Sequence, residues 1–285
     1  MSRGTLMVKY KLSRIRQLAN PRYASWMFLS RFRSECPLRT RLRDELFIEY
    51  LPRGNVSRDL YLGQFEEDVT DFFVHYLRPG MVVIDVGANI GVYSLLSAKY
   101  VGERGAVHAF EPTPDTFAQL CTNAALNRLS CIRTNRLAVS DKSGTSSLYL
   151  YNQNAMNSLA MQDWVGSAVG QVQVDTVSLD EYVRAAELGR VDLLKVDAEG
   201  AELRVLQGAV ELLERPKSPV VVCEFADKTT RNFGYEAAAI REYLENLGYR
   251  LFRWSRRSAT LLPEPARADY ELYANLICTK GEAER

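Results

Sequence analysis

The fold class is indicated most clearly by residues 82–91, Val82-Val83-Ile84-Asp85-Val86-Gly87-Ala88-Asn89-Ile90-Gly91. This segment runs from an apolar β-branched stretch through a short turn into a helical pattern. Gly87 and Gly91 permit positive φ and close approach of another backbone, and Asn89 tolerates the left-handed region better than most side chains. A strand that enters a helix through such a turn aims backbone amides at a ligand. We therefore expect the first unit of an open α/β sheet here, with a binding site at the turn.

The pattern continues outward from this stretch as an alternation of short apolar segments and helical periodicity. We expect strands at residues 81–84, 106–110, 132–139, 191–196, 219–225, 249–254 and 270–278, and helices at residues 66–77, 91–100, 115–126, 201–213 and 235–247. A separate short strand is expected at residues 46–51, before the first of these helices. Strands that alternate with helices favour right-handed crossovers and a parallel sheet covered on both faces. The predicted fold is α/β, a doubly wound and mostly parallel seven-stranded sheet. No helix separates the last two strands, so we expect an antiparallel edge.

Two further segments, residues 144–150 and 171–177, alternate with period two around a polar loop at residues 152–163. We expect them to form a strand pair inserted into the α/β pattern. The insert at residues 149–175 has the amide, hydroxyl and aromatic side chains that could contact a polyol, a composition that is also ordinary for a solvated loop. The side chains concerned are Tyr151, Asn152, Asn154, Asn157, Ser158 and Trp164.

Charge divides the chain into two parts, although 36 Lys and Arg almost balance 35 Asp and Glu. Residues 1–43 carry eleven basic residues and one acid, a net charge of +10 that leaves −9 for residues 44–285. We expect a basic helical N-terminal arm at residues 1–45 and one α/β domain at residues 46–285. The apolar stripe of the arm, which includes Trp26, Phe28 and Phe32, could make peripheral contact with an anionic membrane. Docking on the domain or on a second subunit of a homo-oligomer is the favoured interpretation, because the domain is acidic.

Composition excludes several other classes of protein. Five cysteines without a C-x-x-C pair argue against a disulfide framework or a zinc knuckle, and two histidines leave little for a histidine-rich metal site. We find no run of 18 or more apolar residues and no secretory signal at the start, so we expect a cytoplasmic protein without a membrane span. The near-zero net charge gives no field that would draw the whole molecule to nucleic acid.

The turn differs from a dinucleotide fingerprint, which would require glycine where Asn89 and Val92 stand. Asp85 precedes the turn, and its negative charge would repel a diphosphate but suits a cationic ligand. S-adenosyl-L-methionine carries an ammonium and a sulfonium and fits this pattern. The alternative for Asp85 is a partly buried acid at the end of a strand.

Glu111 follows the second strand, 24 residues after Gly87, where a doubly wound fold places an acid against ribose hydroxyls. Its alternative role is to stabilise the first turn of the following helix.

Three motifs resemble those of the FkbM-type methyltransferases, a branch of the class I S-adenosylmethionine-dependent enzymes. They are Asp85 to Gly91, Phe110-Glu111-Pro112, and Leu194-Lys195-Val196-Asp197-Ala198-Glu199-Gly200-Ala201-Glu202, which is followed by Leu206-x-Gly208-Ala209. The first motif is shared by most class I methyltransferases, whereas the Lys195-x-Asp197-x-Glu199-Gly200 element is specific to this branch. The resemblance covers about residues 45–254 and leaves the basic arm outside.

The resemblance implies a Rossmann-like class I fold and transfer of a methyl group to a hydroxyl of a sugar, a glycan or a secondary metabolite. It carries over Gly87, Asn89, Gly91 and Glu111 as cofactor residues and Ala138 as a neighbour of adenine. Glu66 stands where the family often has an acid before the first strand, and it is assigned to the cofactor on that basis.

Asp197, Glu199 and Glu224 are the candidate catalytic residues, since all three stand at or near the ends of neighbouring parallel strands. An aliphatic hydroxyl needs a base to take its proton, and we expect Asp197 to be that base or to orient the acceptor. Contact with the methionine part of the cofactor, capping of the next helix, and Mg²⁺ binding remain open for these carboxylates, although we assign no metal. We expect Lys195 to pair with a neighbouring acid.

Two rival functions are weighed against O-methyl transfer to a small-molecule or glycan hydroxyl. A nucleic-acid methyltransferase would use the basic arm, but the acidic domain argues against a nucleic-acid partner. A non-catalytic binding module would be expected to lack the three carboxylates.

Overall fold

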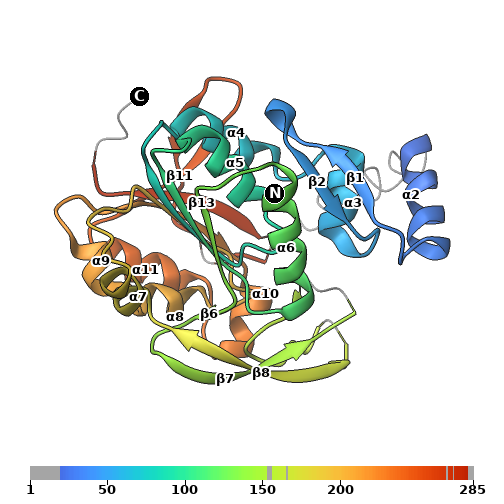
Figure 1. Cartoon of the computed structure of the whole chain (residues 1–285). Coiled ribbons are helices and arrows are strands. Elements are labelled where there is room, and N and C mark those ends of the chain that lie inside the picture. Colours follow the sequence, from blue (N-terminus) through green and yellow to red (C-terminus); the bar gives the residue numbers. More distant parts are fainter. Residues whose placement is uncertain (1–19, 153–155, 165, 268, 272, 282–285) are drawn as a thin grey trace.

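The computed structural model describes residues 20–152, 156–164, 166–267, 269–271 and 273–281 (Figure 1). The apolar and basic residues of the arm before residue 20 lie outside the described residues, as does Asn154. None of the helices in the described ranges has the length and apolar character needed to cross a membrane.

The chain begins with a helix and a hairpin that precede the main sheet. The helix α2 (Pro21–Phe32) is followed by the antiparallel strands β1 (Leu38–Arg41) and β2 (Phe47–Tyr50), with the 3-10 turn η1 (Arg43–Glu45) between them. The helices α3 (Gly54–Leu62) and α4 (Glu67–Tyr76) lead to the sheet. The strand expected near residues 46–51 is present as β2. The expected boundary after residue 45 falls inside this hairpin, because β1 pairs with β2 across it.

One sheet of eight strands forms the centre of the molecule, in the order β12-β11-β13-β10-β9-β3-β4-β5. Five strands, from β10 to β5 in this order, pair in parallel, and β13 is antiparallel to both β10 and β11. The strand bounds are β3 (Val82–Val86), β4 (Ala106–Phe110), β5 (Ile132–Asn135), β9 (Leu193–Val196), β10 (Val220–Phe225), β11 (Arg250–Ser255), β12 (Thr260–Pro263) and β13 (Ala274–Thr279).

The mostly parallel α/β fold is confirmed, with two differences at its antiparallel side. The expected seven strands are joined by an eighth, because the chain turns back after β11 and β12 pairs with it. The last strand, β13, lies between β10 and β11 and is therefore not the edge.

Helices cover both faces of this sheet (Figure 1). Side chains of α4 and α5 (Val92–Val101) pack in one apolar cluster, and those of α7 (Leu179–Ala185), α8 (Glu202–Gln207), α9 (Val210–Glu214) and α11 (Ala238–Asn246) pack in another. Successive residues of β3 face opposite clusters, since Val83 belongs to the first and Ile84 to the second. Burial on both faces explains why these strands are continuous apolar runs. The remaining helices are α6 (Pro114–Leu126), α10 (Asp227–Thr230) and the 3-10 turn η3 (Arg231–Phe233).

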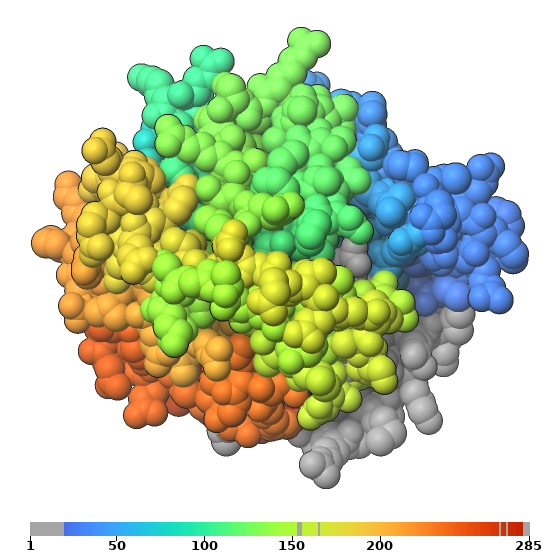
Figure 2. Space-filling model, turned by 60° about the horizontal axis from the view of Figure 1, so that its bottom comes forward, coloured from blue at the N-terminus to red at the C-terminus, as the bar shows by residue number. Residues whose placement is uncertain are grey.

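The inserted strand pair is present as β7 (Gly144–Leu150) and β8 (Gly170–Val177), which pair antiparallel. A short strand, β6 (Ala138–Val139), joins β8 in parallel and makes a separate three-stranded sheet. This small sheet crosses the end of the molecule where the parallel strands finish (Figures 1 and 2). Its position makes the insert one wall of the site described below.

Candidate active site

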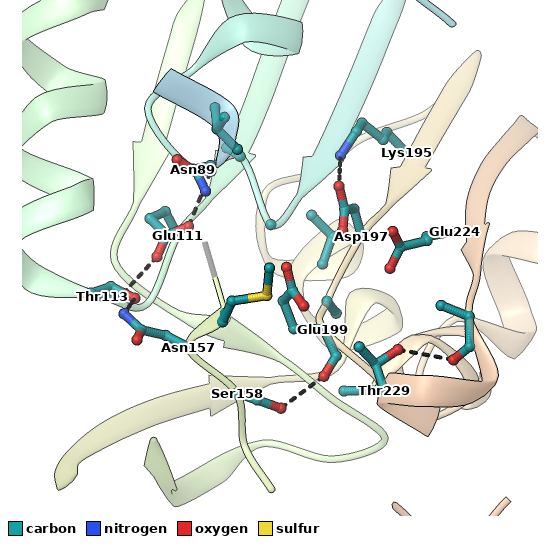
Figure 3. A pocket seen from close by; sticks show the side chains of 18 of the residues that line it. Asn89, Glu111, Thr113, Asn157, Ser158, Lys195, Asp197, Glu199, Glu224 and Thr229 are labelled. Atoms are coloured by element: carbon teal, nitrogen blue, oxygen red, sulfur yellow. Dashed lines mark hydrogen bonds and ion pairs between the residues drawn. The ribbon is translucent and has the colours of Figure 1, made fainter. Parts of the chain in front are cut away.

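A cavity of about 520 Å³ lies beyond the carboxyl ends of β3, β4, β9 and β10. Strand order reverses beside β3, because β4 and β5 follow on one side of it and β9 and β10 on the other. Ligands of open α/β sheets bind at such a reversal. The volume is within the range of small-molecule sites, roughly 300–1,000 Å³. Figure 3 shows residues from all four strand ends around the cavity.

The glycine turn forms one side of the cavity. Gly87 has φ +74°, and a Cβ there would lie 1.7 Å from the carbonyl oxygen of Asp197. The backbones that follow β3 and β9 therefore approach each other as closely as only glycine allows. Asn89 adopts φ +51° and lines the cavity, as expected.

Gly91 lies behind the turn and not on the cavity wall. Its φ is +99°, and a Cβ there would come within 2.7 Å of the Leu120 side chain. Gly91 is also the N-cap of α5. The structure therefore places it in the packing that shapes the turn, whereas the sequence suggested a residue in contact with the ligand.

Glu111 joins the two loops at this end of the cavity. Its Oε2 accepts a hydrogen bond from the Asn89 amide at 3.0 Å, and its Oε1 accepts one from the Thr113 amide at 2.9 Å. Burial raises the pKa of Glu111, while these amides oppose the shift. The carboxylate is held between the glycine turn and the start of α6, and its remaining lone pairs can accept bonds from a sugar diol.

Asp85 differs from the expectation. It is fully buried, it accepts a hydrogen bond from Ser94 Oγ at 2.6 Å, and it does not line the cavity. Its other carboxylate oxygen lies 3.9 Å from Lys195 Nζ. Since residues alternate along β3, the side chain of Asp85 points to the α5 face of the sheet, and its charge acts on the site through Lys195.

Lys195 is a buried cation at the cavity floor. Its Nζ lies 3.1 Å from Asp197 Oδ2 and 4.7 Å from the centre of the Tyr93 ring. Burial by itself would lower the pKa of Lys195, but the negative charges of Asp197, Asp85 and Glu66 raise it above its ordinary value. Lys195 therefore stays charged, and the expected pairing with a neighbouring acid is present.

Glu66 lies with this group on the cavity wall. Its carboxylate accepts a hydrogen bond from the Tyr93 hydroxyl, and it adopts φ +34° at the start of α4. Burial raises the pKa of Glu66, with a further contribution from the charge of Asp197. The position is compatible with the expected contact to a cationic cofactor and equally places Glu66 beside Asp197.

The three candidate catalytic carboxylates all line the same cavity (Figure 3). Burial and the charge of Asp197 raise the pKa of Glu199 and of Glu224 well above the ordinary value. Glu199 adopts φ +50° in the loop after β9, which turns its side chain inward. Because like charges crowd here, the site favours either protonation of some carboxylates or a cationic ligand.

Part of the cavity wall is apolar and suits a flat heterocycle. Ala138 is almost fully buried and lines the wall, as expected for a neighbour of adenine. The other apolar side chains in this part of the wall are Phe110, Leu137, Val139 and Leu148.

The loop between β7 and β8 forms one wall of the cavity. The side chains of Ser158 and Gln162 donate to the carbonyl oxygen of Glu199 at 2.8 and 3.0 Å. Trp164 lines the cavity, and Lys228 Nζ lies 3.5 Å from the centre of its ring. Asn157 and Ser158 also line it, whereas Tyr151 is buried and Asn152 lines a smaller neighbouring cavity.

Glu202 is a site residue to which the sequence analysis gave no role. Its Oε1 accepts bonds from the amides of Ala198 and Gly200 at 2.9 and 3.1 Å, and it is almost fully buried. It thereby shapes the loop that presents Asp197 and Glu199. The signal was an acid directly after a Gly-Ala step at the start of a helix, where a carboxylate can accept free amides.

No group of three or more His, Cys, Asp or Glu side chains in the described ranges has an arrangement that could hold a metal ion. Asp197, Glu199 and Glu224 share one cavity, where carboxylates can serve as general acids, general bases or contacts to a cation.

Comparison with known proteins places this geometry in a family. Residues 85–251 match the family described as the Methyltransferase FkbM domain. The chain is 32% identical over 179 residues to 31-O-demethyl-FK506 methyltransferase FkbM of Streptomyces tacrolimicus, covering 53% of this chain and 67% of that protein. It is 32% identical over 149 residues to the hexuronic acid methyltransferase AglP of Haloferax volcanii, covering 52% of this chain and 58% of that protein.

Among solved structures, the methyltransferase FkbM of Methylobacillus flagellatus aligns with a TM-score of 0.42 and 13% identity, over 78% of this chain and 54% of that one. The two sequence matches thus span about two thirds or less of each relative's length. The family match covers more than half of this chain and includes the glycine turn, Glu111 and the Lys195–Glu202 loop. The chain belongs to the FkbM methyltransferase family.

Proposed function

We propose that this protein transfers a methyl group from S-adenosyl-L-methionine to a hydroxyl of a sugar, a glycan or a secondary metabolite. One observation carries the proposal: a single cavity joins the glycine turn and Glu111 to the carboxylates of Asp197, Glu199 and Glu224. The first group suits an adenosyl donor, and the second group suits an acceptor that must lose a proton.

The residues of the cavity fit the donor in three ways. The apolar wall at Ala138 suits adenine, and Glu111 is held where it can accept bonds from the two ribose hydroxyls. The carboxylates of Glu66 and Asp197 suit the positive charges of the ammonium and the sulfonium. When bound, the donor supplies an electrophilic methyl group on a positively charged sulfur.

The chain's own residues would prepare the acceptor. Asp197 pairs with Lys195 and lines the cavity, so its carboxylate can take the proton of the acceptor hydroxyl as the oxygen forms its bond to carbon. Glu199 and Glu224 would hold neighbouring hydroxyls. The loop between β7 and β8 holds the backbone at Glu199, and alignment of the two reactants in the cavity would supply most of the acceleration.

A hydroxylated acceptor is supported by the side chains at the entrance of the cavity. Trp164 and Tyr273 offer aromatic surfaces, and Asn157, Thr229 and Glu271 offer hydrogen bonds. The names of two relatives agree with this chemistry, since one is a hexuronic acid methyltransferase and another is the 2-O-methyltransferase NoeI of Sinorhizobium fredii.

Incubation of the full chain with radiolabelled S-adenosyl-L-methionine and separate pools of oligosaccharides, small hydroxylated metabolites, RNA and protein tests the proposal. Label should enter the saccharide or metabolite pool as a base-stable ether. Label in RNA would replace the proposal with nucleic-acid methylation. Binding of the donor without label in any pool would favour a binding module.

We further propose a cytoplasmic location, because all five cysteines are free thiols, as in a reducing compartment. Assembly into a homo-oligomer stays a prediction.

A further inference from the structure

The helix α2 has an inner face that packs on the domain and an outer face that remains exposed. Trp26 is buried on the inner face, with its ring centre 5.7 Å from that of Tyr61 in α3. Arg22 reinforces this contact, because its guanidinium donates to the Tyr61 carbonyl at 2.9 Å. The helix is therefore fixed to the molecule through α3. Figures 1 and 2 show it at the outer edge, projecting from the body.

The outer face is strongly apolar for a water-exposed surface. Phe28 is 58% exposed, Phe32 is 69% exposed and Met27 is 55% exposed. The two phenylalanine rings lie side by side, with centres 5.0 Å apart. Exposed aromatic side chains grouped on one helix mark an interaction surface more often than single exposed apolar residues do.

Positive charge lies beside this apolar face. Residues 20–43 carry six arginines and one acid, a net charge of +5, while residues 44–285 carry −9. Arg31 lies in the last turn of α2 and Arg33 is its C-cap, and neither forms an ion pair with another residue of the described ranges. Both guanidinium groups are thus available to an anionic partner.

We propose that this outer face of α2, formed by Met27, Phe28 and Phe32 beside Arg31 and Arg33, docks on an anionic lipid surface. A helix with aromatic side chains on one face and arginines beside them lies in the interface of such a membrane, where rings enter the acyl boundary and cations meet headgroups. A second copy of the chain fits less well, because a symmetric contact would bring the same arginines against each other.

Docking would bring the cavity close to the lipid. α3 holds α2 on its outer side, and its residues Asn55, Arg58 and Asp59 line the cavity on its inner side. The proposed membrane-binding face of α2 therefore lies next to the part of the cavity wall that α3 forms.

Sedimentation of the full chain with vesicles tests this inference without any methyl donor or acceptor, so the result is independent of the proposed reaction. The protein should sediment with vesicles that contain phosphatidylglycerol, and it should bind less to pure phosphatidylcholine. Binding should also weaken as salt is raised, because screening shortens the reach of the charges.

The variant Phe28→Asp/Phe32→Asp should reduce the bound fraction at least about fivefold, because it places two anions in the apolar face. The control Val169→Asp/Leu262→Asp introduces the same charge at two other exposed apolar positions and should bind like the unaltered chain. Thermal unfolding should be similar for all three proteins.

Three results would overturn the inference. They are absence of binding to phosphatidylglycerol vesicles, equal binding by the Phe28→Asp/Phe32→Asp variant, and equal loss in the control. Dissociation of a dimer by the same variant, seen by analytical ultracentrifugation without vesicle binding, would instead assign the face to a second copy.

Discussion

Lys195 is a buried cation between two carboxylates, and its charge decides how Asp197 can act. Asp85 holds it from the α5 side of the sheet, and Asp197 meets it from the cavity. An isolated charge in this place would be costly, but the cation and its partners compensate each other. Removing the cation would leave the buried Asp85 without an opposite charge and would favour its protonation.

We therefore predict opposite signatures for two substitutions. Asp197→Asn should lower the turnover number by about a hundredfold or more, with donor affinity changed only a few fold, because the proton acceptor is lost. Lys195→Met should instead move the acid limb of the pH–rate profile to higher pH, because the charge of Lys195 opposes the raised pKa of Glu66 and Glu199, and its loss lets both carboxylates keep their protons to higher pH.

Steady-state kinetics between about pH 5 and 9 measure both effects. Asp68→Asn, at an exposed position of α4, is the matched control and should leave the profile unchanged. An equal loss of donor binding in Asp197→Asn would assign that residue to the donor, as the sequence analysis left open.

Glu111 has two testable roles. It holds the loops after β3 and β4 together, and it is the proposed acceptor for the ribose hydroxyls. Glu111→Ala removes the acceptor of both the Asn89 and the Thr113 amides. We predict at least about a tenfold loss of affinity for S-adenosyl-L-methionine by calorimetry, equivalent to about 1.4 kcal/mol. Asp115→Asn, an exposed acid in the first turn of α6, should bind normally. Unchanged affinity in Glu111→Ala would contradict the ribose assignment.

Glu202 links the stability of the fold to pH. Burial raises the pKa of Glu202 from 4.5 to about 7. An acid with a higher pKa in the folded state binds more protons when folded, so its contribution to stability is complete below about pH 4.5 and is lost as the pH rises to about 7.

We predict that the free energy of unfolding falls over this range by about 1–3 kcal/mol from this residue. Glu202→Gln cannot ionise, so the free energy of unfolding of this variant should depend less on pH. At low pH the variant should be less stable than the unaltered chain, because the glutamine NH2 at the position of Glu202 Oε2 would have no hydrogen-bond partner. The same pH slope in both proteins would show that another group is responsible.

At the scale of elements, the close contact between the loops after β3 and β9 sets the geometry of the cavity. Gly87→Ala would place a methyl group 1.7 Å from the Asp197 carbonyl oxygen, which no side-chain movement can relieve because both atoms belong to the backbone. Gly80 has a similar φ of +86° but open space around it.

We therefore predict that Gly87→Ala abolishes donor binding and lowers stability by several kcal/mol, whereas Gly80→Ala costs about 1 kcal/mol, the ordinary penalty of positive φ. Urea denaturation and calorimetry compare the two variants. Equal effects would mean that the turn's conformation, and not the contact between loops, demands glycine at position 87.

At the scale of the whole molecule, the acidic cavity predicts proton release when the donor binds. Burial and mutual repulsion raise the pKa of Glu66, Glu199 and Glu224, so these groups keep their protons to a higher pH than an ordinary glutamate does. A bound cation lowers their pKa and expels protons.

Calorimetry at about pH 7 in buffers of different ionisation enthalpy should show release with S-adenosyl-L-methionine. Release should be smaller with S-adenosyl-L-homocysteine, which lacks the sulfonium charge, and smaller in Glu224→Gln. Equal values for the two ligands would show that the sulfonium lies away from the carboxylates.

Local sequence predicted the secondary structure best where a hydrophobic pattern is compatible with only one kind of element. The alternation of apolar runs and helical periodicity predicted the strands β3, β4, β5, β9, β10 and β11, the helices α4, α5, α6 and α11, and the segment that forms α8 and α9. Period-two alternation predicted β7 and β8, whereas α7 and α10 were not predicted and β6 was expected as a continuation of β5. The antiparallel strand β13 was placed beside β11 but not between β11 and β10, because strand order depends on packing between distant segments. β1 and β12 were missed, since both are four-residue edge strands with mostly exposed side chains.

For the site, local sequence was enough to predict the turn at Gly87, Glu111 after β4, the acids after β9 and Glu224 near the end of β10, because the carboxyl ends of neighbouring parallel strands must meet. Three features became visible only in the folded structure. Asp85 and Gly91 lie behind the cavity, Lys195 lies between Asp85 and Asp197, and Glu202 holds the loop at residues 198–200. The physical reason is that side-chain partners on different strands are chosen by register and burial, which no local stretch of the chain contains.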